Sequence, residues 1–232
     1  MFVDRKFRIA RLWSNRELKK FAHLFKGTVV NVSGWTDIDK EGSTYAKYFK
    51  NADTYLISNY KAEARGFQGY KNEFFLDLTK KLPKKHVGKY EVIFNHTTLE
   101  HIYEVQQAFA NLCAMTNDIV IVVVPFVQHM HSHYGDYWRF TPLAIKRMFE
   151  DNKMELLYLS FNHDRHASTY IFAIASKQPK KWKGKIGKKF SYKSPRDFLD
   201  LFENYAGNRA ITNTYVFKVA TLVRAALQKI FK

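Results

Sequence analysis

The amino-acid sequence predicts a doubly wound, Rossmann-like α/β fold, in which seven mostly parallel strands end in a C-terminal antiparallel hairpin. Two observations carry this prediction. Short apolar segments alternate with helical segments over most of the chain, which is typical of parallel sheets. Residues 118–124 contain six Ile or Val in seven positions, as expected for a strand that is buried on both faces.

The first half of the chain contains three of the predicted strands. A helix is expected from Ser14 to about Phe25, because Ser14 and Glu17 have the spacing of a capping box and Gly27 breaks the helical pattern. A further helix is expected around residues 45–50. The three strands are expected at residues 28–32, 53–58 and 73–77.

The second half contains the other four strands. A helix is expected over residues 99–115, and Pro142 predicts the start of another that runs to about Glu150, since proline is favoured in the first turn of a helix. The last two apolar segments are separated by a short polar connection, which indicates an antiparallel pair. The four strands are expected at residues 90–95, 118–124, 154–161 and 170–176.

The composition indicates a folded domain without disulfides or membrane spans. Hydrophobic residues make up 46% of the 232 residues and aromatic residues 16%, which is ample for a packed core. Cys113 is the only cysteine, so an intramolecular disulfide is excluded. The N-terminus lacks the apolar core of a signal peptide, and no apolar run approaches the roughly 20 residues of a membrane span. We therefore expect a cytoplasmic location.

A basic helical extension is expected to follow the α/β domain. The formal net charge is +17, and residues 177–193 hold eight lysines and no acidic residue. Such a segment suits a polyanion, such as an anionic membrane surface or a phosphorylated glycan carrier, and it equally suits a solvated tail. Residues 215–232 predict an amphipathic helix that could dock on the core or a partner, or lie at the inner face of the cell membrane. The predicted domains are residues 1–176 and 177–232.

Polar side chains gather after the fourth and fifth predicted strands. Because parallel strands end at one edge of a sheet, these side chains should meet in the crevice where open α/β sheets bind ligands. Histidine is the usual general base near neutral pH, while aspartate and arginine can orient it or hold an anionic acceptor group. The candidate catalytic residues are His133, His129, Asp136, Arg139 and His101, and His131 belongs to the same loop.

These candidates also have structural interpretations, which the sequence leaves open. His101 could hydrogen-bond to the backbone at the start of a helix, and Arg139 could be a buried ion-pair partner. The aromatic residues beside Arg139 could pack rather than bind a substrate. The three histidines of the loop alternate along an extended segment and could hold zinc on one face. A mobile loop does not preorganise ligands, so we expect no metal.

Four stretches of the chain resemble the class I S-adenosylmethionine (SAM)-dependent methyltransferases. The closest likeness is to the methyltransferase type 11-like branch that occurs in bacterial polysaccharide-biosynthesis clusters. The most distinctive stretch combines Val-Pro-Phe, the histidine loop and Asp-Tyr-Trp-Arg-Phe-Thr, which ends at residue 141. The four stretches are residues 27–34, 76–83, 90–101 and 124–141.

The resemblance implies that SAM binds at the ends of the first, second and fourth strands. The chain departs from the family pattern because Asn31 and Ser58-Asn59 stand where the family has acidic residues, and because Gly34 is the only glycine left in the glycine-rich loop. A neutral acceptor forms a weaker hydrogen bond with a hydroxyl than a carboxylate does. The implied cofactor-binding residues are Asn31, Ser33, Gly34, Trp35, Ser58, Asn59, Asp77, Leu78, Asn95 and His96.

Two functions follow from the resemblance and its departures. The leading hypothesis is SAM-dependent methylation of a sugar or glycan-related acceptor, with O-methylation as the reaction. The departures favour the alternative of a catalytically inactive methyltransferase-like module that binds glycan, lipid or a partner protein. A nucleic-acid methyltransferase is suggested by the charge alone, so no specific nucleic acid is expected as a partner.

Overall fold

The computed structural model places most of residues 8–187 and little of the predicted extension. Residues 188–205 and most of the predicted amphipathic helix lie outside the described residues. Within the part of the chain that the structure describes, no helix is long and apolar enough to cross a membrane. The described residues are 8–61, 66–132, 135–164, 167–187, 206–207, 219, 222–223 and 226–227.

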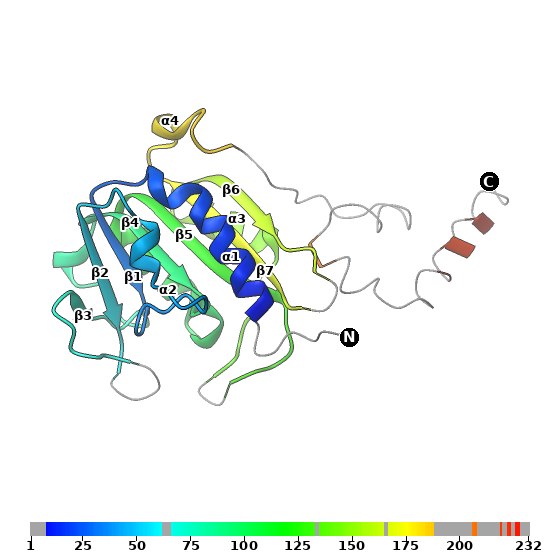
Figure 1. The fold of residues 1–232 in the computed structure, drawn as a ribbon, viewed down its shortest axis with the longest axis horizontal. Coiled ribbons are helices and arrows are strands. Elements are labelled where there is room, and N and C mark those ends of the chain that lie inside the picture. The colour runs from blue at the N-terminus through cyan, green and yellow to red at the C-terminus, as the bar shows by residue number, and fades with distance from the viewer. Residues whose placement is uncertain are drawn as a thin grey trace.

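A seven-stranded sheet forms the centre of the molecule (Figure 1). Its strand order is β3-β2-β1-β4-β5-β7-β6. Strand β7 runs antiparallel to β5 and β6, and the other neighbouring pairs are parallel, which confirms the predicted fold class. The strands are β1 (Thr28–Val32), β2 (Thr54–Asn59), β3 (Glu73–Phe75), β4 (Tyr90–His96), β5 (Thr116–Val127), β6 (Glu155–Phe161) and β7 (Thr169–Ser176).

Strand β5, in the interior of the sheet between β4 and β7, is apolar on both faces. Ile119, Ile121 and Val123 pack into the core on one face of the sheet, and Val120 and Val122 pack into the core on the other. All five side chains are fully buried. Successive side chains of a strand point to opposite faces, so a strand covered on both sides requires an unbroken run of Ile and Val.

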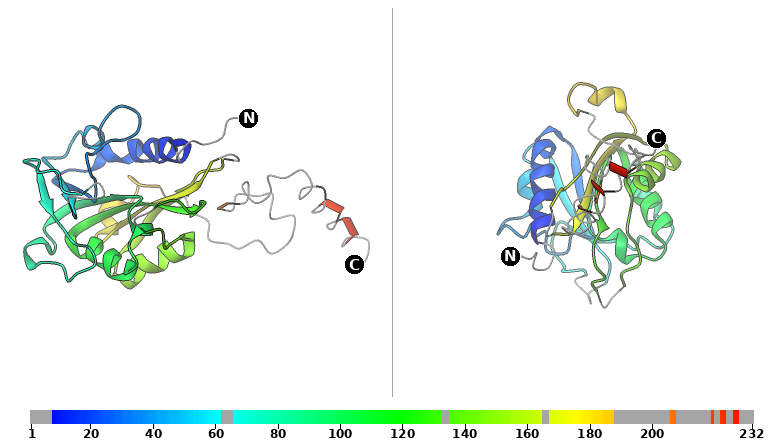
Figure 2. Two further views of the ribbon diagram at one scale, coloured as in Figure 1. Left: turned by 90° about the horizontal axis from the view of Figure 1, so that it is seen from below. Right: turned by 90° about the vertical axis from the view of Figure 1, so that its right-hand side faces the viewer.

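Helices cover the two faces of the sheet unequally. Helix α1 (Arg8–Phe21) lies along one face, and α2 (Val105–Met115) and α3 (Pro142–Asp151) lie on the other (Figure 2). The helix predicted around residues 45–50 is only the 3-10 turn Tyr45–Tyr48. The helix predicted over residues 99–115 is divided into the 3-10 turn η4 (Leu99–His101) and α2.

Helix α1 begins earlier than the capping-box pattern predicts. Ser14 and Glu17 lie inside the helix and are 1% and 5% exposed. The hydroxyl of Ser14 donates to the carbonyl of Arg11 (2.9 Å), and a carboxylate oxygen of Glu17 accepts from the hydroxyl of Tyr158 (2.6 Å). The predicted start is therefore wrong, because these polar side chains serve contacts with the rest of the fold rather than the end of a helix.

The described beginning of the basic segment packs on the α/β domain. Helix α4 (Pro179–Trp182) follows β7. Trp182 is 5% exposed, and its ring lies 5.2 Å from that of Phe25. Its indole Nε1 donates to the buried carboxylate of Asp118 (3.1 Å). The described lysines of this segment are exposed, at Lys177, Lys180, Lys181, Lys183 and Lys185.

The start of α3 offers a simple stability test. The hydroxyl of Thr141 accepts a hydrogen bond from the backbone N–H of Ala144 (3.1 Å), and Pro142 occupies the first turn, as predicted. Thr141→Ala removes this cap and should lower the free energy of unfolding by about 1 kcal/mol in urea titrations. Thr141→Ser keeps the hydroxyl and should lose less than half of that. Equal losses in the two variants would contradict the capping role.

Candidate functional site

The carboxyl ends of β1, β4 and β5 meet at one edge of the sheet. The strand order reverses between β1 and β4, and open α/β sheets bind ligands at such a switch point. Two loops lie at this edge: one follows β4 and contains η4, and the other follows β5. The second loop rests on the first, because the backbone N–H of Tyr137 donates to the carbonyl of Glu100 (2.8 Å).

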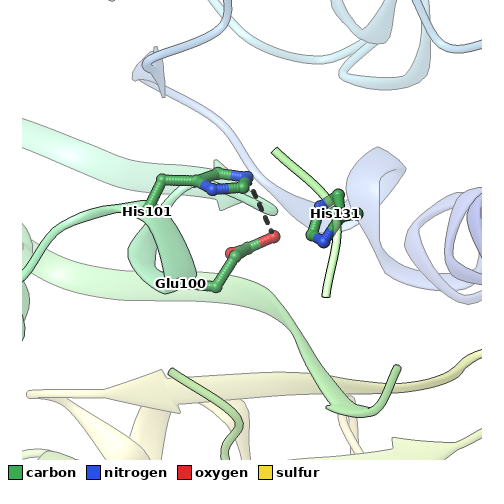
Figure 3. A group of neighbouring side chains, drawn as sticks. All are labelled: Glu100, His101 and His131. Atoms are coloured by element: carbon green, nitrogen blue, oxygen red, sulfur yellow. Dashed lines mark ion pairs between the residues drawn. The ribbon is translucent and has the colours of Figure 1, made fainter. Parts of the chain in front are cut away.

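Glu100, His101 and His131 form a compact group at this edge (Figure 3). Each offers a carboxylate oxygen or a ring nitrogen, and these three atoms lie within 4.8 Å of one another. Nε2 of His101 is 3.7 Å from Oε1 of Glu100, and the two imidazole rings are 5.1 Å apart. The Glu100 side chain is 1% exposed, whereas those of His101 and His131 are 12% and 20% exposed, so the group opens to solvent at the histidines.

Burial dominates the electrostatics of this group. It raises the pKa of Glu100 to about 8, and neither carboxylate oxygen has a hydrogen-bond partner. Burial also lowers the pKa of His101 and that of His131. A charge on any of the three is poorly solvated, so without a ligand their neutral forms are favoured.

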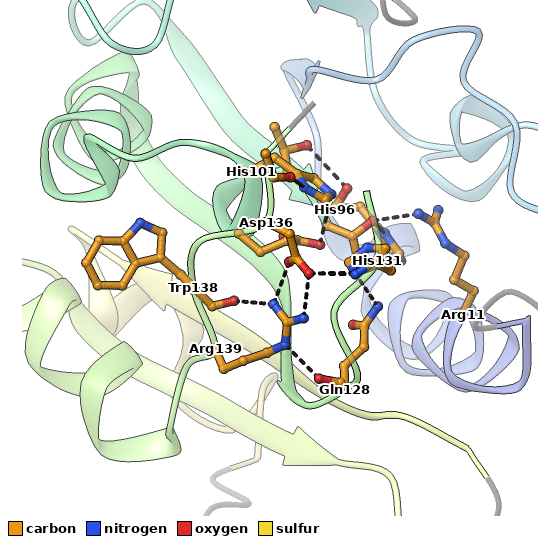
Figure 4. Close-up of polar contacts among 12 residues, drawn as sticks. Arg11, His96, His101, Gln128, His131, Asp136, Trp138 and Arg139 are labelled. Atoms are coloured by element: carbon orange, nitrogen blue, oxygen red, sulfur yellow. Dashed lines mark hydrogen bonds and ion pairs between the residues drawn. The ribbon is translucent and has the colours of Figure 1, made fainter. Parts of the chain in front are cut away.

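Arg139 and Asp136 hold the loop after β5 in place (Figure 4). The guanidinium of Arg139 binds both carboxylate oxygens of Asp136, with Nη1–Oδ1 2.6 Å and Nη2–Oδ2 2.8 Å. Its other N–H groups donate to the backbone carbonyls of Gln128, His129 and Trp138. All five donors bind groups of this loop, which is the arrangement that a structural role requires. The bidentate pair holds the pKa of Asp136 well below its usual range.

Asp136 and Gly135 orient the two histidines. Oδ2 of Asp136 accepts from the backbone N–H of His131 (2.7 Å) and lies 3.3 Å from its ring Nδ1. Nδ1 of His101 donates to the carbonyl of Gly135 (2.6 Å). Gly135 has a φ of 115°, and an added Cβ would lie 2.6 Å from the ring of Tyr137, so the loop requires glycine here.

Helix α1 contributes contacts that the sequence does not suggest. Arg11 Nη2 donates to the hydroxyl of Thr97 (2.7 Å), and the hydroxyl of Ser14 lies 2.8 Å from Nε2 of His96. Burial lowers the pKa of His96 well below its usual value. These contacts join residues 86 and 82 positions apart, and no local pattern could have revealed them.

The structure brings together only some of the predicted catalytic residues. His101, Asp136 and Arg139 meet at the site, together with Glu100, which the sequence analysis does not select. His129 is exposed. His133 lies outside the described residues.

The loop after β1 has backbone conformations that usually require glycine, although other residues occupy most of its positions. Ser33 and Trp35 have φ values of 57° and 50°, in the left-handed region that side chains disfavour. Between them, an added Cβ on Gly34 would lie 2.5 Å from the amide nitrogen of Asn31. Asn31 in turn donates to Oδ1 of Asp37 (2.7 Å). The loop is therefore folded tightly onto the end of β1.

Asn59 closes this loop against the end of β2. Its Oδ1 accepts from the backbone N–H of Trp35 (2.8 Å), and its Nδ2 donates to the carbonyl of Trp35 (3.1 Å) and to Oε1 of Glu73 (2.5 Å). Asn59 and Asn31 are each 2% exposed. Their side chains are engaged within the protein, so they do not fit the cofactor contacts that the resemblance implies.

Other predicted positions carry groups that a polar ligand could use. Oγ of Ser58 and Oδ1 of Asn95 are buried without a hydrogen-bond partner at the ends of β2 and β4. Asp77 is partly exposed and accepts from the N–H and hydroxyl of Thr79 through Oδ1, which leaves Oδ2 for a ligand. Leu78 is buried in the core. Orphaned buried polar groups indicate a missing partner, and these fit SAM at the strand ends.

Known proteins resemble this chain in their fold but not in their sequence. No protein-family model and no curated protein matches the chain. Magnesium protoporphyrin IX methyltransferase from Synechocystis PCC 6803, with bound S-adenosylhomocysteine (SAH), has a TM-score of 0.52 at 11% identity, over 74% of this chain and 85% of that one. The 1,6-didemethyltoxoflavin-N1-methyltransferase from Burkholderia thailandensis, with bound SAH, has a TM-score of 0.52 at 12% identity, over 74% and 83%.

A third solved structure has the same architecture. An O-methyltransferase family protein from Burkholderia thailandensis has a TM-score of 0.50 at 10% identity, over 72% of this chain and 56% of that one. At such identities the likeness concerns the fold alone. The chain has the fold of the class I SAM-dependent methyltransferases.

Proposed function

We propose that the chain is a SAM-dependent methyltransferase that methylates a hydroxyl group of a sugar or glycan-related acceptor. The observation that carries this proposal is the position of the Glu100–His101–His131 group. It lies at the carboxyl ends of β4 and β5, next to the switch point at which such sheets bind their ligands. Methyl transfer mainly requires an acceptor held in line with the methyl group, and a polar group at this edge supports that task.

Ser58, Asn95 and Asp77 are the side chains that would hold SAM. The cofactor would supply the methyl group. Ser58 and Asn95 carry the orphaned polar groups at the ends of β2 and β4, and Asp77 stands in the acidic turn that the resemblance assigns to the adenine. Asn31 and Asn59 keep the loop after β1 folded instead.

Exposed aromatic side chains beside the site support a sugar-like acceptor. Tyr103, Tyr137 and Trp138 are 67%, 54% and 37% exposed, and the rings of Tyr137 and Trp138 lie 5.4 Å and 6.3 Å from that of Tyr103. Exposed apolar clusters of this kind mark binding surfaces. The C–H face of a sugar ring stacks on aromatic rings, so these side chains suit an acceptor of this kind.

The basic segment supports a location near an anionic surface. Five described lysines in and around α4 are exposed, and further lysines follow in the sequence. Such a cluster attracts phosphorylated carriers and anionic headgroups. In this proposal the protein works in the cytoplasm, at the inner face of the membrane, where a lipid-linked glycan would present both charge and acceptor.

A specific observation favours a second function, that of an inactive binding module. Asn59 forms hydrogen bonds with the backbone N–H and the carbonyl of Trp35. These bonds close the loop after β1, which in the family is the loop whose backbone lies against the cofactor. If the closed loop excludes SAM, the aromatic surface and the polar group still form a binding site.

Calorimetry of the full chain with SAM and with SAH separates the two functions. We expect binding in the micromolar range for the methyltransferase. Ser58→Ala removes a hydroxyl that has no partner in the free protein, so the melting temperature should not fall. The loss of one hydrogen bond to SAM, worth about 0.5–1.5 kcal/mol, should weaken binding by about 2- to 12-fold.

Ser160→Ala is the matched control for this experiment. Ser160 is 8% exposed and lies on β6, at the far edge of the sheet. Its replacement should leave the SAM affinity unchanged. If millimolar SAM produced neither heat nor a thermal shift, the methyltransferase proposal would be overturned in favour of the binding module.

A further inference from the structure

Three potential metal ligands converge in the Glu100–His101–His131 group. Their ligand atoms lie within 4.8 Å of one another, so small side-chain rotations can bring all three to the roughly 2.0–2.2 Å that zinc requires. We propose that Glu100, His101 and His131 bind a divalent transition-metal ion, for which Zn²⁺ is the probe.

The buried carboxylate of Glu100 is the strongest indication of a bound cation. The residue is fully buried, and neither carboxylate oxygen has a hydrogen-bond partner. The two arginines whose charges reach it donate elsewhere, Arg11 to Thr97 and Arg139 to its own loop. Ionising this carboxyl group is costly inside the protein, and a metal ion would supply the countercharge that offsets the cost.

The two histidines are held as metal-binding histidines usually are. His101 donates from Nδ1 to the carbonyl of Gly135, and its Nε2 faces Glu100. Nδ1 of His131 lies 3.3 Å from Oδ2 of Asp136, which is itself held by Arg139, and 3.2 Å from Nε2 of Gln128. A carboxylate or carbonyl behind the imidazole orients the ring and raises its basicity as a ligand.

The donor set selects the class of metal. Two imidazole nitrogens and one carboxylate oxygen suit zinc and neighbouring transition metals, whereas calcium and magnesium prefer sites made of oxygen ligands. Three protein ligands leave a coordination position open, and the more exposed histidine side of the group faces solvent. An acceptor hydroxyl could occupy this position. That role rests on the proposed function, whereas metal binding itself does not.

The site differs from the one that the sequence suggests. The alternating histidines of the loop would have to bind a metal on a mobile segment, which argues against a metal. The structure instead combines one of them, His131, with Glu100 and His101 from the turn after β4, and His129 stays exposed. Ligands supplied by two packed loops are preorganised in a way that a single loop is not.

The test uses the full chain, stripped with a chelator and titrated with Zn²⁺ by calorimetry in the absence of SAM. One ion per chain is expected. Co²⁺ at the same site should give the visible absorption bands of a nitrogen- and oxygen-ligated ion. Glu100→Gln keeps the shape of the side chain and breaks no hydrogen bond, so the fold should persist. This variant and His131→Ala should each weaken Zn²⁺ binding by at least about 10-fold, the loss that even the removal of an outer-shell partner causes.

His23→Ala is the control, because His23 is an exposed histidine outside the group. Its Zn²⁺ affinity and Co²⁺ spectrum should match those of the unmodified chain. Equal affinity in all variants would mean that Zn²⁺ binds to surface histidines only. If one ion per chain did not bind, Glu100 would be a neutral buried carboxyl group. Either result overturns the proposal. Because SAM is absent, failure here leaves the proposed methyltransferase function intact, and failure to bind SAM leaves the metal site intact.

Discussion

Asn59→Asp should lower the free energy of unfolding by about 2–4 kcal/mol, although the family pattern favours an acidic residue at this strand end. Nδ2 of Asn59 donates to Oε1 of Glu73 (2.5 Å) and to the carbonyl of Trp35 (3.1 Å). A carboxylate in its place would have no hydrogen to donate and would face a second carboxylate, at a position that is 2% exposed. Urea unfolding followed by circular dichroism measures the loss.

Adding Glu73→Gln to Asn59→Asp shows whether the lost stability comes from repulsion between two carboxylates or from a steric effect. In the double variant Asn59→Asp/Glu73→Gln, an amide again faces a carboxylate, so at least about half of the lost stability should return. The same loss with and without Glu73→Gln would show that Glu73 is not responsible. The expected recovery would explain why this strand end carries an amide where the family carries an acid.

Arg139→Met should lower the free energy of unfolding by about 2 kcal/mol, since breaking a partly buried ion pair leaves a charge without its partner. The carboxylate of Asp136 is 3% exposed and would lose both bonds to the guanidinium. The carbonyls of Gln128, His129 and Trp138 would lose their donors as well. Thermal and urea unfolding measure the change.

Arg147→Met is the matched control for Arg139→Met. Arg147 pairs with Asp151 at 2.9 Å, but the two side chains are 73% and 53% exposed. An exposed pair contributes at most about 1 kcal/mol, so this variant should stay close to the unmodified protein. If both variants lost the same stability, the Asp136–Arg139 pair would not be the anchor of the loop.

The sheet could be predicted from the sequence because its signals are local. The run of Ile and Val in β5, the antiparallel order of β6 and β7, and Pro142 at the start of α3 all read directly from neighbouring residues. The start of α1 could not be predicted, because Ser14 and Glu17 imitate a cap but bind partners elsewhere in the fold.

The candidate site could be predicted only in part. Parallel strands end at one edge, so the sequence correctly brings His101 and Asp136 to the same place. It does not select Glu100, because residues 99–101 read as the first turn of a helix, and the separate turn η4 that buries the carboxylate depends on the loop packed over it. The sequence likewise leaves open whether Arg139 binds an acceptor or stabilises its own loop, because the backbone carbonyls that it contacts come together only when the loop folds.

The sequence by itself determined the order of the strands along the chain, the layer of helices and the edge that carries the polar residues. These follow from hydrophobic periodicity, which acts over a few residues. Only the tertiary structure decided which polar groups find partners: Asn31 and Asn59 are engaged, whereas Ser58, Asn95 and Glu100 have orphaned atoms. Whether a buried polar atom is satisfied depends on atoms brought from distant segments, and a one-dimensional pattern does not contain that information.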